Sequence, residues 1–452
     1  MKKVFKCILA SSIASTLIVS LSFANESINQ NDINNQNSMS KAKVTKPQES
    51  MRDFFRRVAT DFGFNTYGAK KNGTMFFFKG EAIVSLQPSD PDFGRAIVNA
   101  YEQAILDLQS NYIVDTFGTL SSDRVSSLYN DTSTNAKKFE DNLGNETKVN
   151  GIMDKTLDFI DAKLDKGLKE LGRDPKKLTK KQKKTLFKKE LIKSVVTKAY
   201  GNMAGLTPIK THITFDKKGN YSVGVVAVIS AKTQQIAKDM ALLRKSKIKG
   251  NGKDINSFLP QNEKGFLNEL GIRLVYDSQG KPTIISYGRW SYNEDSNDAY
   301  INKMASKTAL EQAKVLADAS IVEFMNTKLS FKSDSQTGEI SERVATREID
   351  NETNAEMLDE KVIKNIVSKV SKEIRARANG KIRGITTFTD WEATDSYGIN
   401  HVGVVRVWNY DNVEAVNNML KVKKNKPSQS KTKTTQSTKT YESKPVNSLN
   451  DF

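Results

Sequence analysis

The sequence predicts an α+β fold with one module present twice, each copy an antiparallel sheet of two β-hairpins packed by long helices. Residues 223–228 (VGVVAV) return as residues 402–407 (VGVVRV), identical at five of six positions and 179 residues apart. Further matches lie 209 residues apart: Tyr67 with Tyr276, Thr74 with Thr283, Glu102–Ala104 with Glu311–Ala313, and Leu120–Ser121 with Leu329–Ser330. Recurrence at a fixed spacing indicates duplication. The two spacings differ by 30, so we expect about 30 extra residues in the first copy, forming a helical-hairpin insertion.

In the first copy, the apolar spacing of residues 51–62 predicts a helix with one buried face. A hairpin should follow, because Asn72-Gly73 tolerates the positive φ of a tight turn. Its strands are expected at 64–67 and 74–86, before a helix at 92–117 and a weakly ordered segment at 120–151. The insertion, about 135–200, should contain a basic helical hairpin with arms at 152–171 and 179–203. Strands at 209–215 and 221–230 and a helix at 233–244 close the copy.

The second copy repeats this order, with expected strands at 272–276, 283–292, 382–391 and 399–410 and helices at 298–328, 354–378 and 412–422. Alanines at four-residue spacing in the first of these helices (Ala305, Ala309, Ala313, Ala317) predict a close approach to a sheet. Because the strands come in local pairs, the sheets should be antiparallel with helices on one face.

The N-terminus has the pattern of a secretory signal: lysines, then an apolar stretch, then small residues ending at Ala24. We expect cleavage after Ala24 and a periplasmic or secreted bacterial protein. The single cysteine, Cys7, would leave with the signal, which excludes disulfides and thiolate chemistry in the mature chain. No second long apolar run occurs, so no stable transmembrane segment is expected after cleavage.

These patterns divide the chain into a signal peptide (1–24), a disordered linker (25–50), a first module (51–244), a linker (245–262), a second module (263–422) and a disordered basic tail (423–452). The formal net charge is +18. Residues 163–198 contribute +10 and residues 421–452 contribute +6, so the duplicated body is nearly neutral.

Eight lysines of the expected helical hairpin are candidate contacts for an anionic partner: Lys176, Lys177, Lys180, Lys181, Lys183, Lys184, Lys188 and Lys189. Such density suits anionic lipid, lipopolysaccharide or nucleic acid, which lysines engage by releasing counterions. Aromatic residues are sparse there, so base stacking is not supported. The alternative interpretation is a solvated helix face.

Few residues offer catalytic chemistry. His212 and His401 are the only histidines and do not occupy equivalent positions, so a metal site is not expected. Glu102 and Glu311 are equivalent and could form an acid–base pair. A helix position inherited by duplication explains them as well, and an uncharacterised hydrolase-type enzyme is a second alternative. No cofactor is expected.

Four aromatic residues of the second copy are candidates for a partner-binding face: Trp290, Trp391, Trp408 and Tyr410. Aromatic residues on strands more often pack in the core or across strands. Both interpretations remain open at the level of sequence.

The helix segment 305–313 (ASKTALEQA) and the strand 402–407 resemble small bacterial envelope modules. These are the twenty-kilodalton lipoprotein family of Helicobacter and the N-terminal module of the Vibrio flagellar assembly protein. The resemblance covers about a third of the chain, and the lipid-attachment cysteine is lacking. It implies a structural or adhesive role in the envelope. We therefore expect a non-enzymatic scaffold that binds envelope proteins or its own copies, with edge strands as the means of pairing.

Overall fold

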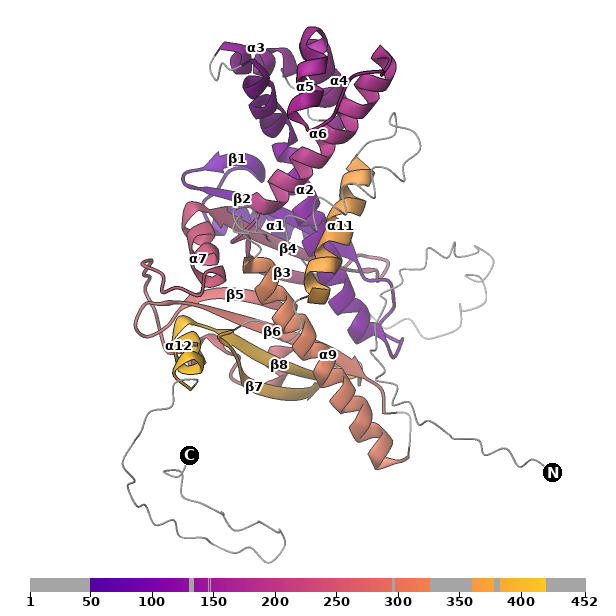
Figure 1. The fold of residues 1–452 in the computed structure, drawn as a ribbon. Coiled ribbons are helices and arrows are strands. Elements are labelled where there is room, and N and C mark those ends of the chain that lie inside the picture. The colour runs from indigo at the N-terminus through magenta and orange to yellow at the C-terminus, as the bar shows by residue number, and fades with distance from the viewer. Residues whose placement is uncertain are drawn as a thin grey trace, which may run out of the picture. The chain divides into compact units, whose positions relative to one another are not determined.

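The computed structural model describes residues 49–129, 134–144, 146, 148–294, 297–325, 360–377 and 383–419. The expected signal peptide and basic tail lie outside these residues, as does the expected N-terminal linker up to residue 48. The α+β prediction is confirmed. The chain forms two antiparallel four-stranded sheets with strand orders β1-β2-β4-β3 and β5-β6-β8-β7, packed by helices (Figure 1).

The first copy consists of α1 (Met51–Asp61), β1 (Gly68–Asn72), β2 (Met75–Ile83), α2 (Phe93–Tyr129), α3 (Thr134–Leu143), α4 (Val149–Ile160), η2 (Asp161–Lys163), α5 (Leu164–Glu170), α6 (Lys180–Asn202), β3 (Thr207–Phe215), β4 (Tyr221–Ser230) and α7 (Ala231–Ala241). The second consists of η3 (Ile255–Phe258), α8 (Glu263–Phe266), β5 (Gly271–Tyr276), β6 (Pro282–Tyr292), α9 (Ala299–Met325), α11 (Glu360–Arg377), β7 (Ile385–Thr394), β8 (Asn400–Trp408) and α12 (Tyr410–Met419).

The closing hairpins of the two copies correspond residue for residue. Thr211 pairs with Val225, and the residues 179 positions later, Asp390 and Val404, pair in the same way. Each hairpin also has a register shift at the same place, between Pro208 and Lys210 in β3 and between Thr387 and Thr389 in β7. Such bulges are specific features of a strand, so their coincidence confirms the duplication.

A close helix-to-sheet contact recurs as well. A Cβ on Gly80 of β2 would lie 2.1 Å from the Ala104 carbonyl oxygen, and one on Gly288 of β6 would lie 1.8 Å from that of Ala313. The alanines are 209 residues apart, as the sequence indicates, but the glycines are 208 apart. Thr74, matched to Thr283 by sequence, accordingly precedes β2 and lies in the turn.

A second layer covers the other face of each sheet. α1 packs Phe54, Phe55 and Val58 against Phe77 and Val226 of the first sheet. In the second sheet this place is taken by η3 and α8, where Phe266 packs with Tyr287, Trp391 and Val405, and Phe258 lies against the same cluster. Part of the segment 245–262, expected as a linker, is therefore structured and contributes to a core.

The segment 120–151, expected to be weakly ordered, is largely helical. α2 continues to Tyr129, α3 follows, and α4 begins at Val149. Phe139, Leu143 and Val149 are buried in the same cluster. Serine, asparagine and aspartate dominate this stretch and obscure the spacing of its few apolar residues, which explains the error.

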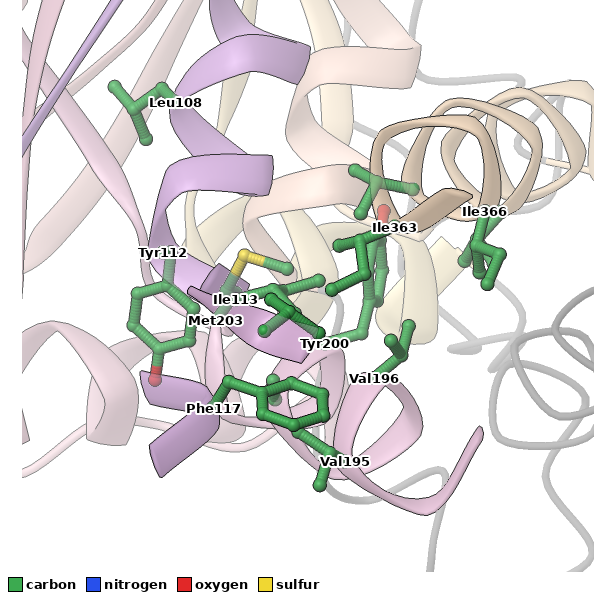
Figure 2. Packing of buried hydrophobic residues seen from close by; sticks show 14 of the residues in the cluster. Leu108, Tyr112, Ile113, Phe117, Val195, Val196, Tyr200, Met203, Ile363 and Ile366 are labelled. Atoms are coloured by element: carbon green, nitrogen blue, oxygen red, sulfur yellow. The ribbon is translucent and has the colours of Figure 1, made fainter. Parts of the chain in front are cut away.

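The two copies share one core. Helices α2 and α6 of the first copy pack with α11 of the second, where Ile113, Val196 and Ile363 belong to one buried cluster (Figure 2). The edge strand β3 of the first sheet also lies beside the edge strand β5 of the second (Figure 1). No helix within the described ranges combines the length and apolar character needed to cross a membrane.

Candidate functional site

The lysine-rich helix α6 is fixed by its own acidic neighbours. Thr179 caps the helix through a capping box with Gln182. Lys180 and Lys184 contact Asp161 at 2.6 and 3.3 Å. The other pairs are Lys183–Asp165 at 2.7 Å and Lys188–Asp154 at 2.5 Å. Four of the eight candidate lysines therefore bridge α6 to the segment formed by α4, η2 and α5.

The remaining four lysines are divided by their exposure. Lys176, Lys177 and Lys181 are exposed, whereas Lys189 is partly buried. Each ion pair at a protein surface contributes little to stability. The pairs nevertheless place an aspartate beside each of these four lysines, so the lysine charges are partly compensated before any anionic partner binds. The eight lysines thus do not form one open basic surface.

The four candidate aromatic residues do not share a face. Trp391 is buried on the α8 side of its sheet and stacks on Phe266, with ring centroids 5.5 Å apart. Trp408 is buried on the opposite side, in the cluster of Ile236 and Phe324. Trp290 and Tyr410 are partly buried and pack against α9-side clusters. Trp391 and Trp408 are core residues, which agrees with the packing interpretation.

The two histidines lie in unrelated environments. His401 of β8 is buried, and its Nε2 atom lies 3.0 Å from Asp395 Oδ2. Burial, together with the nearby charge of Arg289, lowers the pKa of His401 to about 4. His212 of β3 stacks on Phe54 at 4.8 Å, in the position equivalent to Trp391. Within the part of the chain that is described, no three His, Cys, Asp or Glu side chains gather in a metal-binding group.

Glu102 and Glu311, the candidate carboxylate pair, are separated. Glu311 is exposed, whereas Glu102 of α2 is largely enclosed at the junction of the two copies, with 17% of its side chain exposed, and pairs with Arg375 of α11. Arg375 also binds Glu323 of α9, with 2.6 Å between Nη2 and Oε2 and 2.8 Å between Nε and Oε1. Burial raises the pKa of Glu102, and the Arg375 charge opposes this shift. Sequence could not reveal this cluster, because its three members are far apart along the chain.

Two cavities are associated with these helices. One beside Glu323 and Arg375 has a volume of about 40 Å³, enough for water but not for an organic ligand. The other has a volume of about 290 Å³ and lies between α2, α3 and α4, with Asp115 and Glu146 in its wall.

The junction covers one face of the first copy. The N-terminal turn of α2 docks on the second sheet, where Arg95 Nε donates to the Ser291 carbonyl at 3.1 Å. A Cβ on Gly94 would lie 2.5 Å from His401 Cε1, so the two copies are in close contact here. Phe93 meets Tyr397 edge-on at 5.6 Å.

Among the residues that the structure describes, none covers the corresponding face of the second copy. We call it the outer face and define it by the edge of β7 and the exposed side chains Tyr300, Ile301, Met304 and Phe388. The first turns of α9 extend beyond β7 (Figure 1). Sequence reasoning missed these four residues, because their exposure depends on which surfaces of the second copy the other segments cover in the assembled fold.

Comparison with known proteins gives a family match and a structural match. The family model of a domain of unknown function, DUF6844, matches residues 149–242. No curated protein matches the chain. The chain is similar to the 2.3 Å crystal structure of a hypothetical protein, FTT1539c, from Francisella tularensis, at 21% identity and a TM-score of 0.48 over 82% of this chain and 94% of that one.

Proposed function

We propose that the chain is an exported, non-enzymatic scaffold of the bacterial envelope that binds a protein partner through the outer face of its second copy. The observation that carries this proposal is a difference between equivalent surfaces. The first turn of α2 docks on the second copy and buries Phe93 to 1% exposure, whereas the first turns of α9 leave Tyr300, Ile301 and Met304 exposed.

The chemistry of the outer face suits a protein partner. Tyr300 and Ile301 are exposed over 70% and 52% of their surface, and clustered exposed apolar residues are characteristic of contact sites. The adjacent β7 is an edge strand of ten residues. Its unpaired backbone groups can pair with a strand from another chain.

The proposed location is the periplasm or the cell exterior. It is supported by the signal-like residues 1–24, which end at Ala24. The similarity of residues 305–313 and 402–407 to the Helicobacter lipoproteins and the Vibrio flagellar assembly protein favours an envelope role. Candidate partners are other envelope proteins or further copies of the chain.

The test is recovery of partners from the envelope fraction with Tyr300→Asp/Met304→Asp as the altered bait. We expect the bound proteins of the wild type to be lost, because two charges would have to be buried. Leu242→Asp is the matched control, since Leu242 is similarly exposed but lies beyond α7, away from the outer face. Equal recovery by the double variant and the control would overturn the proposal.

A second candidate function is binding to an anionic surface such as lipid, lipopolysaccharide or nucleic acid. The exposure of Lys176, Lys177 and Lys181 favours it. We would measure binding to vesicles containing anionic lipid for the variant with glutamine at all three positions. Exposed lysines elsewhere, Lys217, Lys218 and Lys245, supply the charge-matched control. Vesicle binding that depends steeply on salt and is lost only when Lys176, Lys177 and Lys181 are replaced would support this function. An equal loss of binding in both variants would oppose it.

A further inference from the structure

We propose that the cavity between α2, α3 and α4 is a binding site for a small organic cation, an ammonium group attached to a compact apolar body. We call this cavity the insertion pocket and define it by Asp115, Gly118, Leu143, Glu146 and Ile152 in its wall. All five residues belong to the first copy. The inference therefore goes beyond the proposed function and does not depend on the outer face.

The insertion pocket has the size and the floor of a small-ligand site. Its volume of about 290 Å³ lies near the lower end of the range of about 300–1,000 Å³ that small-molecule sites occupy. Leu143 and Ile152 are buried, with 8% and 2% of their surface exposed, and Val114 lies in the same wall. An apolar body placed against these side chains leaves water, which is favourable.

The pocket is kept open by Gly118 of α2. Among the described residues, a Cβ at this position would meet only the Cδ1 atoms of Ile152 at 3.7 Å and Leu143 at 3.8 Å, which is ordinary contact. The packing would therefore accept alanine, which also stabilises the interior of a helix relative to glycine. Close packing does not explain this glycine. Its effect is to leave space above the apolar floor.

Two carboxylates line the same wall. Asp115 is exposed at the mouth, and Glu146 is partly buried. The Oε1 atom of Glu146 accepts a hydrogen bond from the backbone N–H of Lys148 at 2.9 Å. Its carboxyl group also lies against Gly151, where a Cβ would be only 2.3 Å from the Glu146 Cδ atom. The Glu146 carboxylate is thus fixed in the wall before a ligand binds.

The charges of the wall select a cation. Among the wall residues that the structure describes, Asp115 and Glu146 are the charged ones, and both are acidic. The neighbouring Lys155 donates from Nζ to the carbonyl oxygens of Asn142 at 2.9 Å and Leu143 at 2.8 Å, so its charge is held at the end of α3. An ammonium group would form charge-assisted hydrogen bonds with the carboxylates, and these are stronger than neutral ones.

The experiment compares phenethylamine, phenethyl alcohol and hydrocinnamate on the full chain without its signal. The amine is protonated at about pH 7, as a lysine is, so the probes share an aromatic ring and differ in charge. Isothermal titration calorimetry measures their binding. We expect the amine to bind with a Kd of about 1 mM or lower, which is within the reach of so small a ligand. The alcohol and the carboxylate should bind at least about tenfold more weakly.

Two substitutions test the two parts of the pocket. Gly118→Leu places a side chain above the floor and should weaken amine binding by about tenfold or more, whereas Gly118→Ala fills little space and should retain it. Glu146→Gln removes the charge but keeps an acceptor for the Lys148 N–H, and it should weaken amine binding by about fivefold or more. Glu311→Gln, at an exposed position of α9, is its matched control and should bind as the wild type does.

Several results would overturn the inference. They are the absence of amine binding up to about 10 mM, binding of the alcohol or the carboxylate as tight as that of the amine, and unchanged amine binding in Glu146→Gln. A folded Gly118→Leu protein that binds the amine like the wild type would also overturn it, because the ligand would then lie elsewhere. Circular dichroism verifies folding, and if Gly118→Leu does not fold, Glu146→Gln and its control decide the question.

Discussion

Gly288 of β6 and Ala313 of α9 are in such close contact that a Cβ on the glycine would lie 1.8 Å from the alanine carbonyl oxygen. The helix can approach this far because neither residue has a bulky side chain at the crossing. Gly80 and Ala104 make the same contact in the first copy. The pair of contacts sets the distance between each sheet and its long helix.

Replacing either glycine by alanine should therefore separate helix and sheet. We expect Gly288→Ala and Gly80→Ala each to lower the free energy of unfolding by about 1–3 kcal/mol, the usual cost of overpacking. Gly118→Ala is the matched control, because its Cβ would meet nothing closer than 3.7 Å and alanine favours a helix. Urea denaturation measures all three, and a Gly288→Ala protein as stable as Gly118→Ala would contradict the packing described here.

Trp391 and Trp408 should stabilise the folded protein. Both are buried in apolar clusters on opposite sides of the second sheet. We expect Trp391→Ala and Trp408→Ala each to cost about 3–5 kcal/mol of unfolding free energy, as for other large buried side chains. Tyr300→Ala, at an exposed aromatic residue, should change stability by less than about 0.5 kcal/mol. Tolerance of both tryptophan variants would instead favour the partner-face interpretation.

Arg375 should be the most sensitive member of the buried charge cluster. Arg375→Met would leave the carboxylates of Glu102 and Glu323 facing each other without a cation. Removing one partner of a buried pair commonly costs about 3–5 kcal/mol. Arg56→Met, which breaks an exposed pair with Asp53, should cost less than about 1 kcal/mol. Similar denaturation midpoints for the two variants would be inconsistent with the buried cluster.

Glu102 should make stability depend on pH. Burial raises the pKa of Glu102 in the folded protein, so the fold favours the protonated carboxyl. Its contribution is fully present below the ordinary pKa of 4.5 and decreases as the pH rises above that value. Glu102→Gln keeps the neutral form at every pH. Relative to the wild type, it should therefore become more stable as the pH is raised from about 4 to 8, and a constant difference would contradict the raised pKa.

His401 should make stability depend on pH in the opposite sense to Glu102. Its pKa is lowered to about 4 from the ordinary 6.5, mainly by burial and also by Arg289. The folded state thus favours neutral imidazole, and its contribution to stability is present above pH 6.5 and lost as the pH falls toward 4. The full loss is on the order of 3 kcal/mol. We expect the free energy of unfolding of His401→Gln to fall less steeply between pH 6.5 and 4 than that of the wild type. An unchanged dependence on pH would show that other groups cause the acid sensitivity.

The sequence predicted the elements that recur within short stretches of the chain. The spacing of 179 between residues 223–228 and 402–407 holds through the whole closing hairpin, and the alanines of α9 do meet a sheet. Sequence did not predict α8, because a helix of four residues has too few positions to show a period. Nor did it predict the shared core, since the presence of Val196 and Ile363 in one buried cluster depends on how helices from different copies assemble.

The candidate sites were harder to predict for the same reason. The lysine cluster was visible in sequence, but the pairing of four of its lysines with Asp154, Asp161 and Asp165 depends on the packing of α4 and α5 against α6. The equivalence of Glu102 and Glu311 was visible too. Glu102 is largely enclosed and Glu311 lies in solvent because the chain contains two modules, so only the first has a neighbour covering that face.

The matching bulges in β3 and β7 imply an order of events in the history of the chain. An irregularity present at the same place in both hairpins was inherited from the ancestral single module, before the gene doubled. Neither hairpin has gained or lost a residue since then, although the stretch between α2 and α6 has changed in length. The hairpins are therefore interchangeable parts, and a chimaera with residues 385–408 transplanted in place of residues 206–229 would keep every cross-strand partner.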